Sequence, residues 1–144
     1  MESTLKNRST WIMVVLYFGW IVSYVDRTAI TLALTSIGSD LTLTATQLGF
    51  VLSAFFMGYA LMQIPGGWLA DRFGIIKILI IAVAFWSVFT AFTGLAWSLV
   101  VLILIRFLFG IGEGGYPAAS TKAIATYYEK SQRTKAQSTM MSSN

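Results

Sequence analysis

Long apolar stretches alternate with short polar segments along this chain. Residues 41–70 and residues 78–105 contain no charged side chain, and each stretch is longer than the roughly 20 apolar residues that cross a bilayer core. Nearly all of the sequence between Trp11 and Pro117 has the same character. The pattern therefore predicts an all-α membrane protein whose helices pass through the lipid bilayer.

Local breaks in this pattern place the ends of four membrane-spanning helices. The second span opens with the capping-box sequence Thr44-x-x-Gln47 and is expected to loosen at Pro65. A helix that ran unbroken from residue 75 to Arg106 would be longer than the bilayer is thick, since a helix rises about 1.5 Å per residue. We therefore place a turn at Gly94–Ser98. The expected helices cover residues 11–34, 44–68, 75–93 and 99–119, and a fifth is expected to start at about residue 133.

The positions of the cations predict the orientation, because lysine and arginine are retained on the cytoplasmic side of a membrane. Under the four-span arrangement the loop and terminal cations fall on one side; they are Lys6, Arg8, Arg72, Lys77, Lys122, Lys130, Arg133 and Lys135. The opposite loops hold only Asp40 as a charged residue. We therefore expect residues 1–10 to form a cytoplasmic N-terminus of a multi-pass protein in the cell membrane.

Composition narrows the possible chemistry. Only 11% of the 144 residues are charged, against about 25% in ordinary soluble domains. The net charge of +4 reflects the cytoplasmic cations, and we expect no nucleic-acid partner. The chain contains no cysteine and no histidine, which excludes thiolate metal sites and histidine-based proton transfer. We expect no metal and no cofactor, and any proton carrier must be a carboxylic acid.

Four ionisable residues lie inside the predicted spans. Asp26 and Arg27 belong to the first span, and Arg106 and Glu113 belong to the fourth. Each costs about 2.5 to 3.5 kcal/mol to insert, so such residues face a bundle interior or a wet cavity. Arg106 and Glu113 are seven residues apart and therefore share one helix face. Asp26 with Arg106, or Glu113 with Arg27, could simply pair to hold the two helices together.

The same residues also suit a transport site. The fixed charge and forked donors of Arg27 suit a carboxylate. A buried carboxyl group can bind and release a proton near neutral pH, which points to Glu113, and Asp26 could couple the two events. Tyr24 and Tyr59 could line the same cavity, although tyrosines in membrane helices are also common as anchors and packing residues.

The sequence Gly110-x-Gly112-x-x-Gly115 matches a dinucleotide-binding fingerprint, but its context excludes that function. The fingerprint requires a short strand ahead of it in a soluble αβ unit, whereas here a span-length apolar run precedes it. Close packing of helices through small residues explains these glycines better. We also expect that the chain is not an enzyme, because it offers no histidine, cysteine or close carboxylate pair for nucleophilic catalysis.

Two segments carry a family resemblance. The sequence Gly67-x-Leu69-Ala70-Asp71-Arg72-x-Gly74 resembles the signature loop of the major facilitator superfamily, in the position after the second helix where that family has it. The sequence Arg106-x-x-x-Gly110-x-Gly112-Glu113 resembles the fourth-helix signature of the same superfamily. Together with Tyr24-x-Asp26-Arg27 and Tyr59, these segments make the chain similar to the anion:cation symporter family.

This resemblance implies the N-terminal part of a twelve-helix fold and the transport of a small organic anion, such as a sugar acid, together with protons. It implies substrate binding by Arg27, Tyr24 and Tyr59, and proton coupling by Asp26 and Glu113. It places Arg106 in the same charge network. A cytoplasmic gating loop would consist of Gly67, Asp71, Arg72 and Gly74.

The four predicted spans are fewer than the twelve that the resemblance implies. We therefore expect a fragment whose partners include the missing C-terminal helices of the same transporter, and we expect that it does not transport alone. Within a complete transporter the other partners would be the organic anion, protons and the lipid bilayer. The alternative is a truncated, nonfunctional or regulatory membrane fragment without transport activity of its own.

Overall fold

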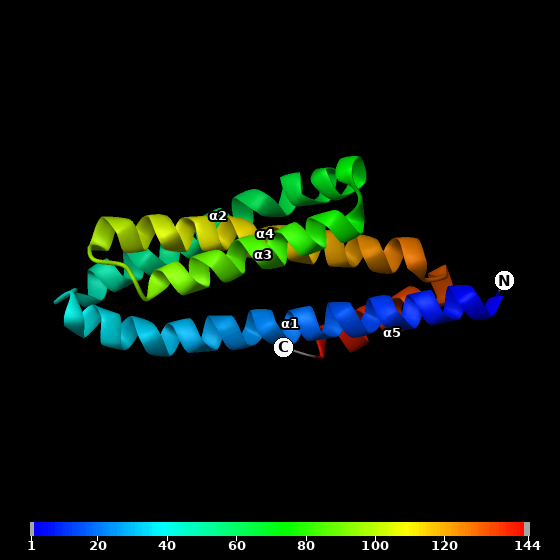
Figure 1. Ribbon diagram of the computed structural model, residues 1–144, viewed down its shortest axis with the longest axis horizontal. Coiled ribbons are helices and arrows are strands. Elements are labelled where there is room, and N and C mark those ends of the chain that lie inside the picture. Colours follow the sequence, from blue (N-terminus) through cyan, green and yellow to red (C-terminus); the bar gives the residue numbers. More distant parts are fainter. Residues whose placement is uncertain (1, 143–144) are drawn as a thin grey trace.

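All regular elements of the computed structural model, which describes residues 2–142, are helices (Figure 1). They are α1 (Glu2–Asp40), α2 (Ala45–Phe73), α3 (Ile75–Thr93), α4 (Leu99–Tyr127) and α5 (Lys130–Met141). The first four contain segments long and apolar enough to cross a membrane, whereas α5 is short and polar. The predicted fold class, four membrane-spanning helices followed by the start of a fifth, is confirmed.

The helices α1 and α5 differ from their expected bounds. α1 begins at Glu2 and ends at Asp40 instead of covering residues 11–34, and α5 begins at Lys130 instead of near residue 133. The apolar pattern marks the part of a helix that crosses the bilayer, but a helix ends only where its backbone changes conformation. For α1 that change comes at Thr42, which has a φ of 52° in the left-handed region.

The helices α2 and α4 also run further than expected, to Phe73 and Tyr127 instead of residues 68 and 119. Pro65 lies inside α2 and Pro117 inside α4. A proline removes one backbone hydrogen bond and can bend a helix, but in both cases the helix continues beyond it. Both helices therefore extend beyond the ends that the sequence predicted.

The segment expected to form a gating loop is mostly helical. Gly67, Asp71 and Arg72 lie in the last turns of α2, and only Gly74 lies outside it. Gly74 has a φ of 97°, a conformation that glycine adopts readily because it lacks a β-carbon. The chain therefore turns at this one residue, and the expectation of a loop from Gly67 onward is wrong.

Two local predictions at helix starts and turns are confirmed. Thr44 and Gln47 form the predicted capping box, with the Gln47 amide donating to Thr44 Oγ1 at 3.3 Å and the Thr44 amide donating to Gln47 Oε1 at 2.8 Å. The predicted turn at Gly94–Ser98 separates α3 from α4. Ser98 caps α4, because its Oγ accepts a hydrogen bond from the Val101 amide at 3.3 Å.

Consecutive helices from α1 to α4 run in alternating directions along the long axis (Figure 1). The α1–α2 and α3–α4 connections lie at one end. The start of α1, the α2–α3 connection and the α4–α5 connection lie at the other end. The connections that carry the cations therefore share one end of the bundle, as the charge pattern requires; that this end is cytoplasmic stays a prediction.

The helix α4 occupies the centre, because it contacts each of the four other helices. Its closest neighbour is α2, and glycines on both helices allow this approach. A β-carbon at Gly58 would collide with the backbone of Phe107, and one at Gly110 would collide with the backbone of Phe55 and Tyr59. Small residues that let helix backbones approach closely are typical of packing inside membranes.

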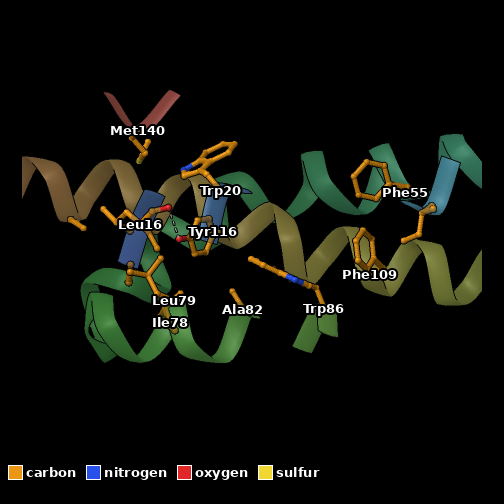
Figure 2. Close-up of a cluster of buried hydrophobic side chains, with 14 of the residues drawn as sticks. Leu16, Trp20, Phe55, Ile78, Leu79, Ala82, Trp86, Phe109, Tyr116 and Met140 are labelled. Carbon is orange, nitrogen blue, oxygen red and sulfur yellow. Dashed lines mark hydrogen bonds between the residues drawn. The ribbon is translucent and has the colours of Figure 1, made fainter. Parts of the chain in front are cut away.

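An aromatic cluster joins α1 and α3 to α4 (Figure 2). The buried Tyr116 of α4 donates a hydrogen bond from its hydroxyl to the carbonyl oxygen of Leu16 at 3.2 Å. Its ring meets Trp20 of α1 and Trp86 of α3 edge-on, with centroids 6.1 and 5.3 Å away. These contacts fix one side of α1 against the central helix.

Replacing Gly110 with alanine is expected to destabilise the α2–α4 contact, because the added methyl group would meet backbone atoms. Overpacking costs about 1–3 kcal/mol, and the collision with backbone puts this site at the upper end of that range. The better helix propensity of alanine returns at most about 1 kcal/mol. The apparent melting temperature of the purified protein in detergent measures the net effect.

Gly49→Ala is the matched control, since Gly49 also lies in a membrane-spanning helix and a β-carbon there meets nothing within 4 Å. A Gly110→Ala protein that melts no lower than the Gly49→Ala protein would contradict the packing described here.

Candidate functional site

The most deeply buried carboxylate in the described part of the chain is that of Glu113, with 1% of its side chain exposed. It accepts hydrogen bonds from two side chains of α1. Arg27 Nε lies 3.0 Å from one carboxylate oxygen and 3.1 Å from the other, and Ser23 Oγ donates to the first oxygen at 2.5 Å. Ser23 and Arg27 are one turn apart, so both reach Glu113 from the same face of α1.

The side chain of Arg27 is only partly buried, with 36% of it exposed. Its guanidinium carbon lies 5.0 Å from the ring centroid of Tyr59 and 5.7 Å from that of Phe55. Both rings belong to α2, and aromatic faces attract a cation at this distance. One terminal nitrogen, Nη2, is buried without a hydrogen-bond partner among the described residues. Arg27 therefore connects α1 to both α2 and α4 and keeps one donor unused.

The side chain of Arg106 is 1% exposed and reaches across to the end of α3. Its Nη2 donates to Thr93 Oγ1 at 2.6 Å, and its guanidinium carbon lies 5.0 Å from the ring centroid of Phe109. No ion pair joins Arg106 to a carboxylate within residues 10–142. Its Nε is buried and also lacks a partner in that part of the chain.

The half-buried Asp26 lies within electrostatic reach of Arg106 and faces the indole of Trp86. It forms no ion pair in the part of the chain that the structure describes. Of the two pairings considered from the sequence, Glu113 with Arg27 is formed and Asp26 with Arg106 is not. Asp26 therefore stays close to the network without being bound into it.

A cleft of about 110 Å³ opens beside these charges. Both arginines line it, together with Ile30, Thr31, Leu52, Phe55, Phe56 and Phe109. The two guanidinium groups are thus the charged parts of an otherwise mostly apolar wall. Ligand sites commonly have this character, with a few placed polar groups among apolar side chains.

The structure brings five of the six predicted site residues in the membrane together and leaves one apart. Those that come together are Asp26, Arg27, Tyr59, Arg106 and Glu113. Tyr24 is 52% exposed, and no described contact joins its side chain to the others. Sequence reasoning missed Ser23 and Thr93; the spacing of Ser23 one turn before Arg27 could have revealed it, whereas Thr93 carries no such signal.

A second ion pair closes the end of the bundle where α2 meets α4. Asp71, near the end of α2, pairs with Lys122 of α4, and Lys122 Nζ also lies 3.5 Å from the carbonyl oxygen of Gly67. The sequence analysis placed Asp71 in the expected gating loop but did not identify Lys122 as its partner. Arg72 instead stacks near the rings of Trp68 and Phe73, at 5.3 and 5.8 Å.

Comparison with known proteins decides what this helical arrangement is. Residues 16–144 match the family model described as Major Facilitator Superfamily. The chain belongs to the major facilitator superfamily. The predicted superfamily is therefore confirmed.

Several curated members of the superfamily are similar to this chain. The probable sulfoacetate transporter of Cupriavidus necator is 43% identical over 135 residues, which are 92% of this chain and 31% of the relative. The hexuronate transporter of Bacillus subtilis is 38% identical over 122 residues, covering 85% of this chain and 29% of the relative. Both relatives are named as transporters, one for sulfoacetate and one for hexuronate.

A solved structure of the superfamily has the same fold. A bacterial homologue of the human lysosomal transporter Spinster, in an inward-facing and unoccupied conformation, superposes with a TM-score of 0.86 at 31% identity. The match covers 94% of this chain and 28% of the homologue. The chain thus spans about a third of the length of the superfamily members that it matches.

Proposed function

We propose that this chain forms part of a transporter that carries a small organic anion, such as a sugar acid, together with protons across the cell membrane. Further helices of the same transporter complete the path, and the N-terminus is cytoplasmic. The observation that carries the proposal is the Arg27–Glu113 ion pair, because one of its members lines the cleft and the other is sheltered from it.

Arg27 is the proposed receptor for the anion. It lines the cleft, a third of its side chain is exposed, and its Nη2 has no partner among the described residues. Its forked donors suit a carboxylate or sulfonate in a bidentate manner. The rings of Tyr59 and Phe55 hold the guanidinium from the α2 side, and Tyr24 is proposed to contact the anion from the open side of α1.

Glu113 is the proposed proton carrier, because its protonation state controls Arg27. While Glu113 is ionised, its carboxylate occupies Arg27 Nε through two short contacts. When Glu113 is protonated, the attraction between the two groups is lost and Arg27 needs another anion, since an unpaired charge inside a membrane is costly. Proton binding and anion binding therefore favour each other at this pair.

Asp26 and Arg106 extend this network. Asp26 is proposed as a second proton carrier, because it is half-buried, lies within reach of Arg106 and is free of an ion pair in the described residues. Arg27 and Arg106 together would balance the charge of the two carboxylates while the site is empty of substrate. The four groups then carry no net charge together, which keeps the cost of burying them low.

The ends of α2 and α4 are proposed to form a gate. The Asp71–Lys122 pair joins these helices, and Gly74 allows the chain to turn sharply into α3. Gly67 contributes the carbonyl oxygen that Lys122 approaches, and Arg72 stacks on the same helix end. Breaking the Asp71–Lys122 pair would free only the last turns of α2, because glycine contacts hold the rest of α2 against α4.

The names of the relatives support an anionic cargo. Those similar to this chain include transporters named for sulfoacetate, for hexuronate and, in Escherichia coli, for galactarate and D-glucarate. All of these compounds are small organic acids. Each of these acids needs a cation at its binding site, and Arg27 provides one at the cleft.

Arg27→Lys in the full-length transporter is expected to abolish saturable anion binding although the positive charge is kept. Lysine offers a single ammonium group in place of a planar fork with five donors, so it cannot bind a carboxylate and Glu113 together in the same geometry. Isothermal titration with the transported anion measures the loss. Arg133→Lys on α5 is the matched control, and equal affinities in the two variants would remove Arg27 as the receptor.

Glu113→Gln is expected to keep exchange of anion across the membrane while losing accumulation driven by a proton gradient. Glutamine has nearly the same shape but cannot carry the proton, so Arg27 stays available at all pH values. Uptake into proteoliposomes, with and without an imposed pH gradient, separates the two activities. Glu129→Gln, at the start of α5, is the control; undiminished gradient-driven accumulation in Glu113→Gln would show that another group couples the proton.

A further inference from the structure

Two guanidinium groups, not one, face the cleft. Arg27 comes from α1 and Arg106 from α4, and both line the same space of about 110 Å³. Each has a buried nitrogen without a partner in the described residues, Nη2 of Arg27 and Nε of Arg106. Buried donors of charged groups are rarely left unsatisfied, because each costs free energy. The cleft therefore offers two separate places for an anionic group.

Arg106 has the stronger need for such a partner. Its side chain is 1% exposed, and its one described acceptor is the neutral hydroxyl of Thr93. Glu113 is already bound by Arg27 and Ser23, and Asp26 forms no ion pair with Arg106 within residues 10–142. A buried cation without an ion-pair partner is expensive unless an anion joins it during function.

Thr93 holds Arg106 in a fixed orientation. Its hydroxyl donates its hydrogen to the carbonyl oxygen of Phe89 at 2.9 Å, so a lone pair of the same oxygen is directed to Arg106 Nη2 at 2.6 Å. The ring of Phe109 lies against the guanidinium face. With Nη2 and one face occupied in this way, Nε is the donor of Arg106 that still lacks a partner among the described residues.

We propose that the cleft is built for a dianion, with one acidic group bound by Arg27 and the second by Arg106. This inference rests on the function proposed above and narrows its substrate class. Charge balance agrees with it: the two arginines and two carboxylates of the empty site sum to zero, and a dianion that enters with both carboxylates protonated restores that sum. A monoanion that enters with one carboxylate protonated gives the same sum, but it brings no second acidic group to Arg106.

The wall of the cleft beside the two arginines is mostly apolar. The apolar rings of Phe55 and Phe109, whose centroids are 5.6 Å apart, form part of its wall and offer no further charge. Selectivity between acids of equal length then depends on the second acidic group.

Matched pairs of probes test the inference in the full-length transporter. Sulfoacetate and 2-hydroxyethanesulfonate form one pair, and galactarate and galactonate form the other. In each pair a carboxylate is replaced by a hydroxymethyl group and the rest of the molecule is kept. For whichever pair the transporter binds, isothermal titration should show that the dianion binds with an affinity at least roughly tenfold higher than that of the monoanion. A hydrogen bond to a charged group implies a difference of this size.

Two variants assign this preference to Arg106. Arg106→Gln should reduce the affinity for the dianion roughly tenfold or more beyond any change for the monoanion, so that the preference is lost. Thr93→Val should reduce the preference in the same direction, because it removes the acceptor that positions Arg106, and Thr93→Ser should restore it. Thr90→Val is the matched control, since Thr90 makes the same kind of hydrogen bond on α3, to the carbonyl oxygen of Trp86, whereas the described hydrogen bond of Arg106 goes to Thr93.

The outcomes separate this inference from the proposed function. Equal affinities for dianion and monoanion in the unmodified transporter, or a preference that survives both Arg106→Gln and Thr93→Val, would overturn the dianion site while leaving Arg27 as an anion receptor. Failure of all four probes to bind would instead overturn the proposed function, and the dianion site with it.

Discussion

The burial of Glu113 determines how the rest of this bundle is arranged. An ionised carboxylate with 1% of its side chain exposed is tolerated inside a membrane only if opposite charge and hydrogen-bond donors meet it. Here both come from one face of α1, through Ser23 and Arg27. The position and rotation of α1 relative to α4 follow from that need, and so does the presence of a guanidinium at the cleft.

The two sides of α4 are held by different kinds of contact. Glycines bring α2 close enough for backbone to meet backbone, which makes α2 and α4 a stiff pair. α1 is instead joined to α4 by side chains, namely the Arg27–Glu113 pair and the hydrogen bond from Tyr116 to Leu16. Side-chain contacts can exchange partners when a proton or an anion arrives, whereas the glycine contacts cannot. The chemistry is thus placed at the interface that is able to respond.

The apolar pattern was sufficient to predict four spans, and the cost of buried charge was sufficient to predict that Arg27, Arg106 and Glu113 face the inside of the bundle. Only the two arginines line the cleft, because Glu113 is bound behind it by Ser23 and Arg27. Helix ends were not predictable, because apolar composition marks the part of a helix that crosses the bilayer and not the residue at which the helical backbone ends. The helix α2, for example, continues beyond Pro65 to Phe73. The sequence also could not show which carboxylate pairs with an arginine, because this depends on how α1 is rotated about its axis. In the structure that rotation brings Arg27 to Glu113 and leaves Asp26 without an ion pair in the described residues. Thr93 and Lys122 were missed because their partners lie on other helices, at distances in sequence that no local pattern reports.

The central claim is that a proton and an anion act on the same ion pair, and proton uptake during anion binding tests it most directly. The full-length transporter in weakly buffered detergent solution near neutral pH is mixed with an anion that it binds, and a pH-indicator dye follows the free proton concentration. The account predicts that protons leave the solution as the anion binds, and that Glu113→Gln reduces this uptake. Anion binding with no proton uptake in the unmodified protein would contradict it.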